Sequence, residues 1–140
     1  MKCPECGAPG SQCQERFNEF LALEFSDAAF FAVHHLTVAT FMLQHSSRLS
    51  REGWICEREL LSAILAEDQP PDSVGKQARH FLDGGGCGVG FKSKDGLPVV
   101  AISTWTKTIL DVCSESADVY ARDITSWARA ALEEANKLDL

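Results

Sequence analysis

Four long stretches of the chain have apolar residues at helical spacing, and in most of them these residues recur every three or four positions, which places them on one face of an α-helix. The first stretch predicts a helix over residues 12–25, and its apolar residues are Phe17, Phe20, Leu21 and Phe25. Ser11 and Gln14 have the spacing of a capping box at its start. The second stretch predicts a helix over residues 28–45 with Asp27 as its N-cap. This second helix is apolar on almost every side, so we expect it to lie at the centre of the core.

Further helices are predicted in the rest of the chain. Ser50 is expected to cap a third helix, which contains Trp54 and must end before the segment that begins at Asp68 and continues with two prolines. A shorter helix is predicted over residues 73–82. Residues 116–137 predict a long amphipathic helix, whose apolar positions include Tyr120, Ile124, Trp127, Ala131 and Leu138.

The segment from Gly84 to Gly90 is too rich in glycine to form a helix. It lacks the full glycine patterns of nucleotide-binding loops, so no nucleotide cofactor is predicted. Asp95 and Gly96 follow residues 89–92 and precede residues 98–102, which predicts a turn between two short strands. The expected fold is therefore a small, mainly α-helical domain with one short antiparallel β-hairpin.

No linker or internal repeat divides the chain, so its 140 residues are expected to form one domain. We expect four parts within it: a metal-binding knuckle over residues 1–13, a helical core over 14–83, a glycine-rich loop and hairpin over 84–105, and a C-terminal helix within 106–140. The N-terminal residues do not read as a signal peptide and no stretch is apolar enough to span a membrane, which predicts a soluble cytoplasmic protein.

The net charge is -7, from 20 acidic and 13 basic residues. An acidic chain repels the phosphate backbone, so nucleic acid is not the favoured partner; an unknown protein or a small molecule is the remaining expectation. The chain has six cysteines. In a reducing compartment they are better explained as metal ligands or buried thiols than as three disulfides.

The strongest chemical signal is the N-terminal sequence in which Cys3 and Cys6 are separated by Pro4 and Glu5 and followed by Gly7. Two thiolates at this spacing can bind one tetrahedral ion, and a glycine allows the tight turn that follows, so the motif predicts a Zn²⁺ knuckle. The alternatives are a redox pair and an unliganded pair. A redox pair of this kind would be expected between a strand and a helix, a context that the sequence does not provide.

A structural zinc site needs two further ligands, and eight cysteines and histidines could supply them: Cys13, Cys56, Cys87, Cys113, His34, His35, His45 and His80. Cys13 is the nearest to the knuckle, and His34 lies on the helix expected to pack against the first one. His45 follows His34 by eleven residues, about 16 Å along a helix, so the two cannot share an ion. We therefore predict ligation by Cys3, Cys6, Cys13 and His34, with His35, His45 and Glu24 as possible additional site residues.

Three stretches together resemble an uncharacterised bacterial family of small proteins, a domain of unknown function. They are the knuckle at residues 3–8 with Cys13, the segment 33–38 leading to His45, and residues 109–112 followed by 127–129. In the family pattern the recurring histidine precedes any residue, then Leu, Thr and Val, so the resemblance implies His34 rather than His35. The resemblance implies no reaction.

Three functional hypotheses follow. The leading one is a binding or regulatory module of unknown biochemical function, in which four filled positions make the zinc ion structural. The first alternative is a small hydrolase-like zinc enzyme, in which three side chains bind the ion and Glu24 or His35 activates a bound water. The second alternative is a thiol or metal sensor that uses Cys87 together with the knuckle.

Overall fold

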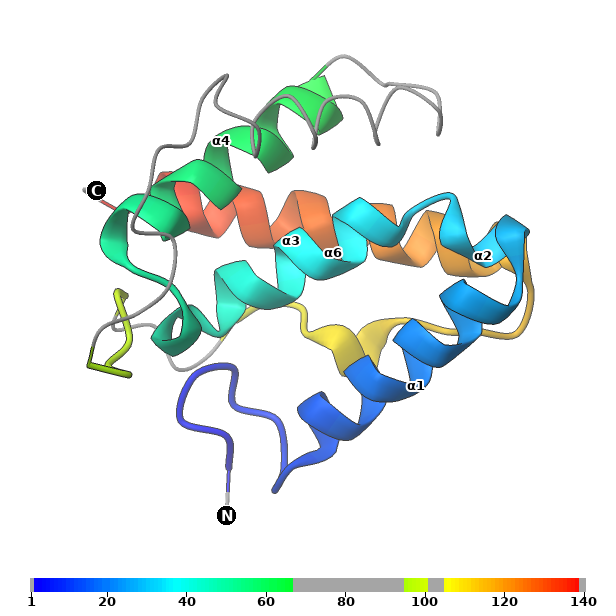
Figure 1. The fold of residues 1–140 in the computed structure, drawn as a ribbon, viewed down its shortest axis with the longest axis horizontal. Coiled ribbons are helices and arrows are strands. Elements are labelled where there is room, and N and C mark those ends of the chain that lie inside the picture. The colour runs from blue at the N-terminus through cyan, green and yellow to red at the C-terminus, as the bar shows by residue number, and fades with distance from the viewer. Residues whose placement is uncertain (1, 67–94, 101–104, 139–140) are drawn as a thin grey trace.

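Helix α3 is the element around which the others pack (Figure 1). The structure is a computed structural model that describes residues 2–66, 95–100 and 105–138. Its elements, in chain order, are α1 (Gln12–Ser26), α2 (Ala28–Phe31), α3 (His34–Gln44), the short 3-10 helix η1 (Ser46–Arg48), α4 (Arg51–Ala66), the 3-10 helix η3 (Ile109–Asp111) and α6 (Ala117–Asn136). The described part of the chain is mainly helical, as the sequence predicts.

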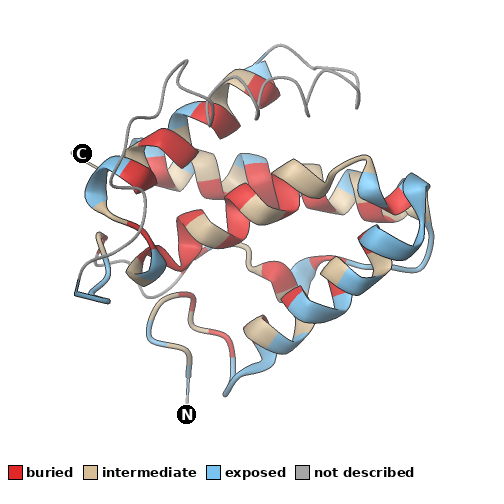
Figure 2. Ribbon diagram, in the orientation of Figure 1, coloured by how far each residue is buried: buried red, intermediate tan, exposed pale blue. Residues whose placement is uncertain are grey.

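Helix α3 contacts α6, α4 and α1. Figure 2 shows buried residues along most of its length, and these residues are Leu36, Thr37, Ala39, Thr40, Phe41, Leu43 and Gln44. Because an apolar helix is stable only when neighbours cover most of its surface, this packing explains why the segment carries so few charges. The expectation that it lies at the centre of the core is confirmed.

The end of α3 is held by two buried tryptophans. The indole N–H of Trp54 donates to the Leu43 carbonyl at 3.0 Å. The indole N–H of Trp127 donates to the Gln44 side-chain oxygen at 3.1 Å, and the Gln44 amide donates in turn to the Lys107 carbonyl at 2.8 Å. Buried indoles normally need such acceptors. These contacts fix the position of the residues that follow α3, including those of the candidate site.

Most of the predicted helix boundaries agree with the structure. Asp27 accepts a hydrogen bond from the Ala29 N–H, and Ser50 and Ser116 cap α4 and α6 in the same way. The capping box predicted at Ser11 is wrong, because its hydroxyl donates to the Glu15 side chain and accepts no cap hydrogen bond.

The predicted helix over residues 28–45 is divided into α2 and α3. Val33, between them, has φ -109° and ψ 17° and so leaves the helical region. The Thr37 hydroxyl oxygen lies 3.1 Å from the Val33 carbonyl oxygen. No glycine or proline marks this break, and apolar residues continue before Val33 and after His35, so the hydrophobic pattern could not reveal it.

The described residues contain no β-strand; the pairing of Lys2 with Pro9 is an isolated bridge. The predicted hairpin over 89–102 lies mostly outside the described residues, and its described part, residues 95–100, is irregular. The predicted helix over 73–82 lies wholly outside them. Among the helices that the structure describes, none is long and apolar enough to cross a membrane.

Glu57 on α4 is a carboxyl group in the core, with 8% of its surface exposed. Burial raises its pKa to about 7, from 4.5 in an exposed side chain. Between these two values the folded protein binds more protons than the unfolded chain, so the free energy of unfolding should fall as the pH rises, by roughly 3 kcal/mol in all. We expect Glu57→Gln to remove this dependence. Urea unfolding of both proteins from pH 4.5 to 8 would measure the difference, and parallel profiles would contradict the prediction.

Candidate metal centre

The N-terminal loop folds back on itself before α1 begins. The Cys3 N–H donates to the Ala8 carbonyl at 2.7 Å, and the Gly7 N–H donates to the Cys3 carbonyl at 2.9 Å. Gly7 has a φ of 84°, a value that side chains disfavour, which explains the need for glycine at this position. The turn brings Cys3 and Cys6 to the same side of the loop.

The sulfur of Cys3 receives hydrogen bonds from backbone N–H groups. Partial burial alone would raise the pKa of Cys3, but the N–H groups of Cys6 and Glu5 hold it below its ordinary value. Cys13 lies in the first turn of α1, where it is buried beside the loop. Three thiols thus meet where the N-terminal loop joins the first helix.

His45 completes the cluster from the end of α3. Its ring nitrogen Nδ1 lies 2.8 Å from the Phe41 carbonyl, which can only accept, so Nδ1 carries the proton and Nε2 has a free lone pair. The imidazole also stacks on the Phe41 ring, with ring centres 4.0 Å apart. The residue is 3% exposed, and Nε2 has no hydrogen-bond partner. A fixed tautomer with one free buried nitrogen is the usual arrangement of a histidine that binds a metal.

The sulfur atoms of Cys3, Cys6 and Cys13 and a ring nitrogen of His45 all lie within 4.8 Å of one another. Sulfurs around a tetrahedral zinc ion are about 3.8 Å apart, given a bond length of about 2.3 Å. The four donors are therefore close enough to bind one ion with only small adjustments. The residues fit a metal of the zinc type.

The electrostatics of the cluster also favour a cation. Burial raises the pKa of Cys6 and of Cys13, and the neighbouring sulfurs add to this effect because their negative charges would repel one another. Burial lowers the pKa of His45, so its ring is neutral at pH 7. A bound divalent cation would reverse the penalty on the thiolates while leaving the neutral imidazole free to coordinate.

His34, the histidine indicated by the sequence, does not lie in this cluster. Its Nδ1 is 2.8 Å from the carboxylate of Glu24, near the end of α1, whereas Cys13 lies at the start of that helix. Cys13 and Glu24 are eleven residues apart, about 16 Å along the helix. His34 therefore lies beside the end of α1 that is opposite to Cys13. The histidine next to the three thiols is His45, where the sequence had predicted His34.

Glu24 belongs to a separate buried network. Its carboxylate is 1% exposed and also accepts hydrogen bonds from the hydroxyl of Thr37 at 2.6 Å and from that of Tyr120 at 2.5 Å. The pKa of Tyr120 is raised by burial and by its contact with Glu24. His35 lies next to this network, with its ring centre 5.5 Å from that of His34. Neither Glu24 nor His35 is part of the thiol cluster.

The remaining cysteines are not in the cluster as far as the structure describes them. Cys56 is buried in α4 and takes part in a disulfide, contrary to the expectation of a free buried thiol, and Cys113 is exposed near the start of α6. Cys87 lies outside the described residues, as does His80. The sensor hypothesis that relies on Cys87 therefore has no described geometry.

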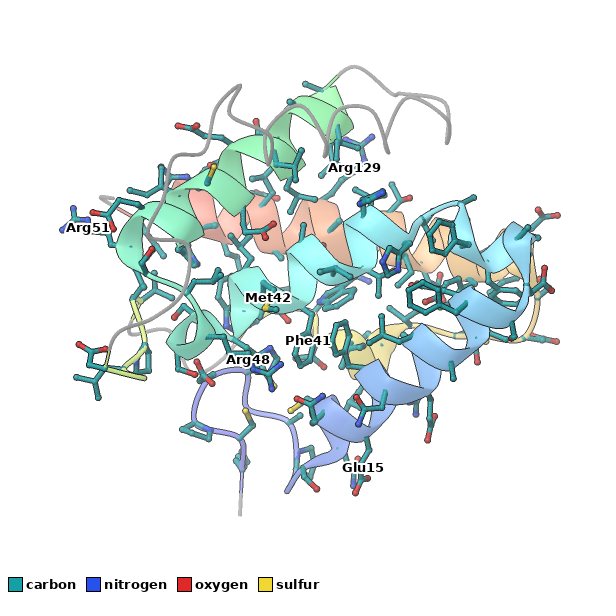
Figure 3. The ribbon with its side chains drawn as sticks, in the orientation of Figure 1. Glu15, Phe41, Met42, Arg48, Arg51 and Arg129 are labelled. Atoms are coloured by element: carbon teal, nitrogen blue, oxygen red, sulfur yellow. The ribbon has the colours of Figure 1, made fainter. Side chains whose placement is uncertain are left out.

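The loop that carries the thiols is fastened to the turn that carries His45. The Glu5 carboxylate accepts hydrogen bonds from the backbone N–H of Ser47 at 2.8 Å and from its hydroxyl at 2.9 Å. The Glu5 carbonyl accepts from the indole N–H of Trp105 at 3.1 Å. Arg48 donates to the Gln14 side chain, and Figure 3 shows Arg48 on the side of the turn that faces the loop. The two halves of the cluster are thus joined by contacts other than those to an ion.

The model of a family of unknown function, DUF5946, matches residues 1–136. This match confirms the resemblance that the three sequence stretches indicated. Neither the curated proteins nor the solved structures gave a match.

Proposed function

Since the chain belongs to this family of unknown function, we propose from the site itself that Cys3, Cys6, Cys13 and His45 hold a structural zinc ion. The protein is then a non-catalytic binding or regulatory module, in which the ion ties the N-terminal loop to the helical core.

The observation that carries the proposal is the free Nε2 of His45. A buried ring nitrogen without a partner destabilises the folded state, by about 1–3 kcal/mol for a polar group of this kind. The nearest suitable partner is an ion held by the three thiols that lie within 4.8 Å. One ion would therefore satisfy the imidazole and the three sulfurs together.

Zinc is the best match for this set of donors. Thiolates and imidazole are soft to borderline ligands, and three cysteines with one histidine form a common structural zinc set. Four protein ligands leave no place for a reactive water molecule. The carboxylate considered for water activation, Glu24, is occupied by its own network at the far end of α1. These points support a structural role over the hydrolase-like alternative.

X-ray absorption at the zinc edge, with elemental analysis, tests the proposal in the purified wild-type protein. We expect one zinc per chain, bound by three sulfurs and one imidazole nitrogen. Three protein ligands and one oxygen would instead support the hydrolase-like zinc enzyme. The absence of any metal would refute both the structural site and the enzyme.

A matched pair of variants then identifies the histidine. His45→Gln should remove the imidazole signal from the absorption spectrum and weaken zinc binding by more than the roughly 10–100-fold that loss of an outer contact costs. His34→Gln should keep three sulfurs and one imidazole, because its new amide can still donate to Glu24. If His34→Gln alone removed the signal, the ligand assignment would be reversed.

A further inference from the structure

The residue between the two knuckle cysteines that is best placed to control the site is Glu5. Its carbonyl accepts a hydrogen bond from the Trp105 indole, and its carboxylate accepts two hydrogen bonds from Ser47. The backbone and the side chain of Glu5 therefore contact two different segments next to the site. Glu5 is not itself one of the four candidate ligands.

We propose that Glu5 is the positioning residue that brings His45 to the three thiols, and so determines that the fourth ligand is an imidazole. The proposal rests on the proposed zinc site. Ser47 is only two residues after His45, within the short helix η1 that follows α3. A carboxylate that grips Ser47 at two points therefore sets the distance between the loop that carries Cys3 and Cys6 and the turn that carries His45.

The contact has the strength and direction that this role requires. Hydrogen bonds to an ionised carboxylate are about twice as strong as those between neutral groups, and two acceptor oxygens also fix orientation. The histidine itself is already fixed by its contacts with Phe41, so docking the loop is the remaining step. Without Glu5, a water molecule could replace the imidazole as the fourth ligand while the three thiolates stay bound.

The test compares Glu5→Ala and Glu5→Gln with Glu15→Ala in protein loaded with Zn²⁺ or Co²⁺. Glu15 is an exposed acid in the first turn of α1, near Cys13 but away from the turn that carries His45 (Figure 3). Its removal changes the local charge as much as removal of Glu5. A difference in metal binding between the two alanine variants therefore reflects the location of Glu5 and not the loss of one negative charge.

We expect Glu5→Ala to weaken metal binding by about 10–100-fold and to lose the imidazole signal at the metal edge, with three sulfurs retained. Glu5→Gln should fall between this variant and the wild type, because one amide oxygen can still accept from the Ser47 N–H. Glu15→Ala should match the wild type. The Glu5→Gln result stands in for Glu5→Ala if the alanine variant does not fold.

Wild-type affinity and an intact imidazole signal in both Glu5 variants would overturn the positioning role. That result would leave the zinc site itself in place. A wild-type protein that binds neither metal would instead overturn the proposed function, so the two failures are distinct.

Discussion

Removal of the proposed zinc ion should lower the free energy of unfolding by about 4 kcal/mol, if the folded protein binds zinc about 1,000-fold more tightly than the unfolded chain does. In a chain of 140 residues this corresponds to a fall of roughly 10 °C in the unfolding temperature. The physical reason is that an ion in the proposed site would join the loop to the helical core only in the folded state. Calorimetry of the zinc-loaded and the chelated protein, in the presence of a reductant, measures the change.

Two serine variants provide the control for this experiment. Cys6→Ser removes a thiol of the cluster, so its unfolding temperature should respond little to the chelator. Cys113→Ser removes an exposed thiol outside the cluster and should respond as the wild type does. An unfolding temperature that the chelator does not change in the wild type would argue against a structural ion.

Replacement of Glu24 by alanine should destabilise the protein by about 3–5 kcal/mol, the usual result when one partner of a buried charged network is removed. His34, Thr37 and Tyr120 would lose the acceptor that they share. Urea unfolding measures the loss. A Glu24→Ala protein within about 1 kcal/mol of the wild type would contradict the prediction.

A milder variant and a second measurement separate this network from the metal site. Tyr120→Phe removes one of the three donors and should cost about 1.5–3 kcal/mol, since the carboxylate keeps the other two. Folded Glu24→Ala should retain three sulfurs and one imidazole at the metal edge. Loss of the imidazole signal in Glu24→Ala would place this carboxylate in the metal site, as the sequence had allowed.

The choice between the histidines shows what the sequence could have revealed. In two antiparallel helices of equal rise, the residue numbers of facing pairs have a constant sum. Glu24 faces His34, Cys13 faces His45, and a third facing pair, Phe17 and Phe41, has ring centres 3.9 Å apart. In each of the three pairs, the two residue numbers sum to 58. Because the chain reverses at Asp27, the two helices run in opposite directions, and this pairing follows. The sequence-based choice of His34 considered only that the helices pack together and not that they are antiparallel.

Other features followed directly from local patterns. The caps at Asp27 and Ser50 were predicted because short polar side chains at helix starts satisfy free backbone N–H groups. The break at Val33 was not predictable, because no glycine or proline marks it. The Glu24 network was also hidden, since a glutamate in an amphipathic helix is normally expected to face solvent.

The positions of the four donors along the chain determine how an ion in the proposed site would contribute to folding. Cys3, Cys6 and Cys13 are close together in sequence, so an unfolded chain can also gather them around an ion, and such binding does not favour the folded state. His45 is far from them, and bringing it close in an unfolded chain costs about 3 kcal/mol of loop-closure entropy. In the proposed site, the bond to His45 would therefore form chiefly in the folded state. The preference of the ion for the folded chain would then come from this one distant ligand rather than from Cys3 and Cys6.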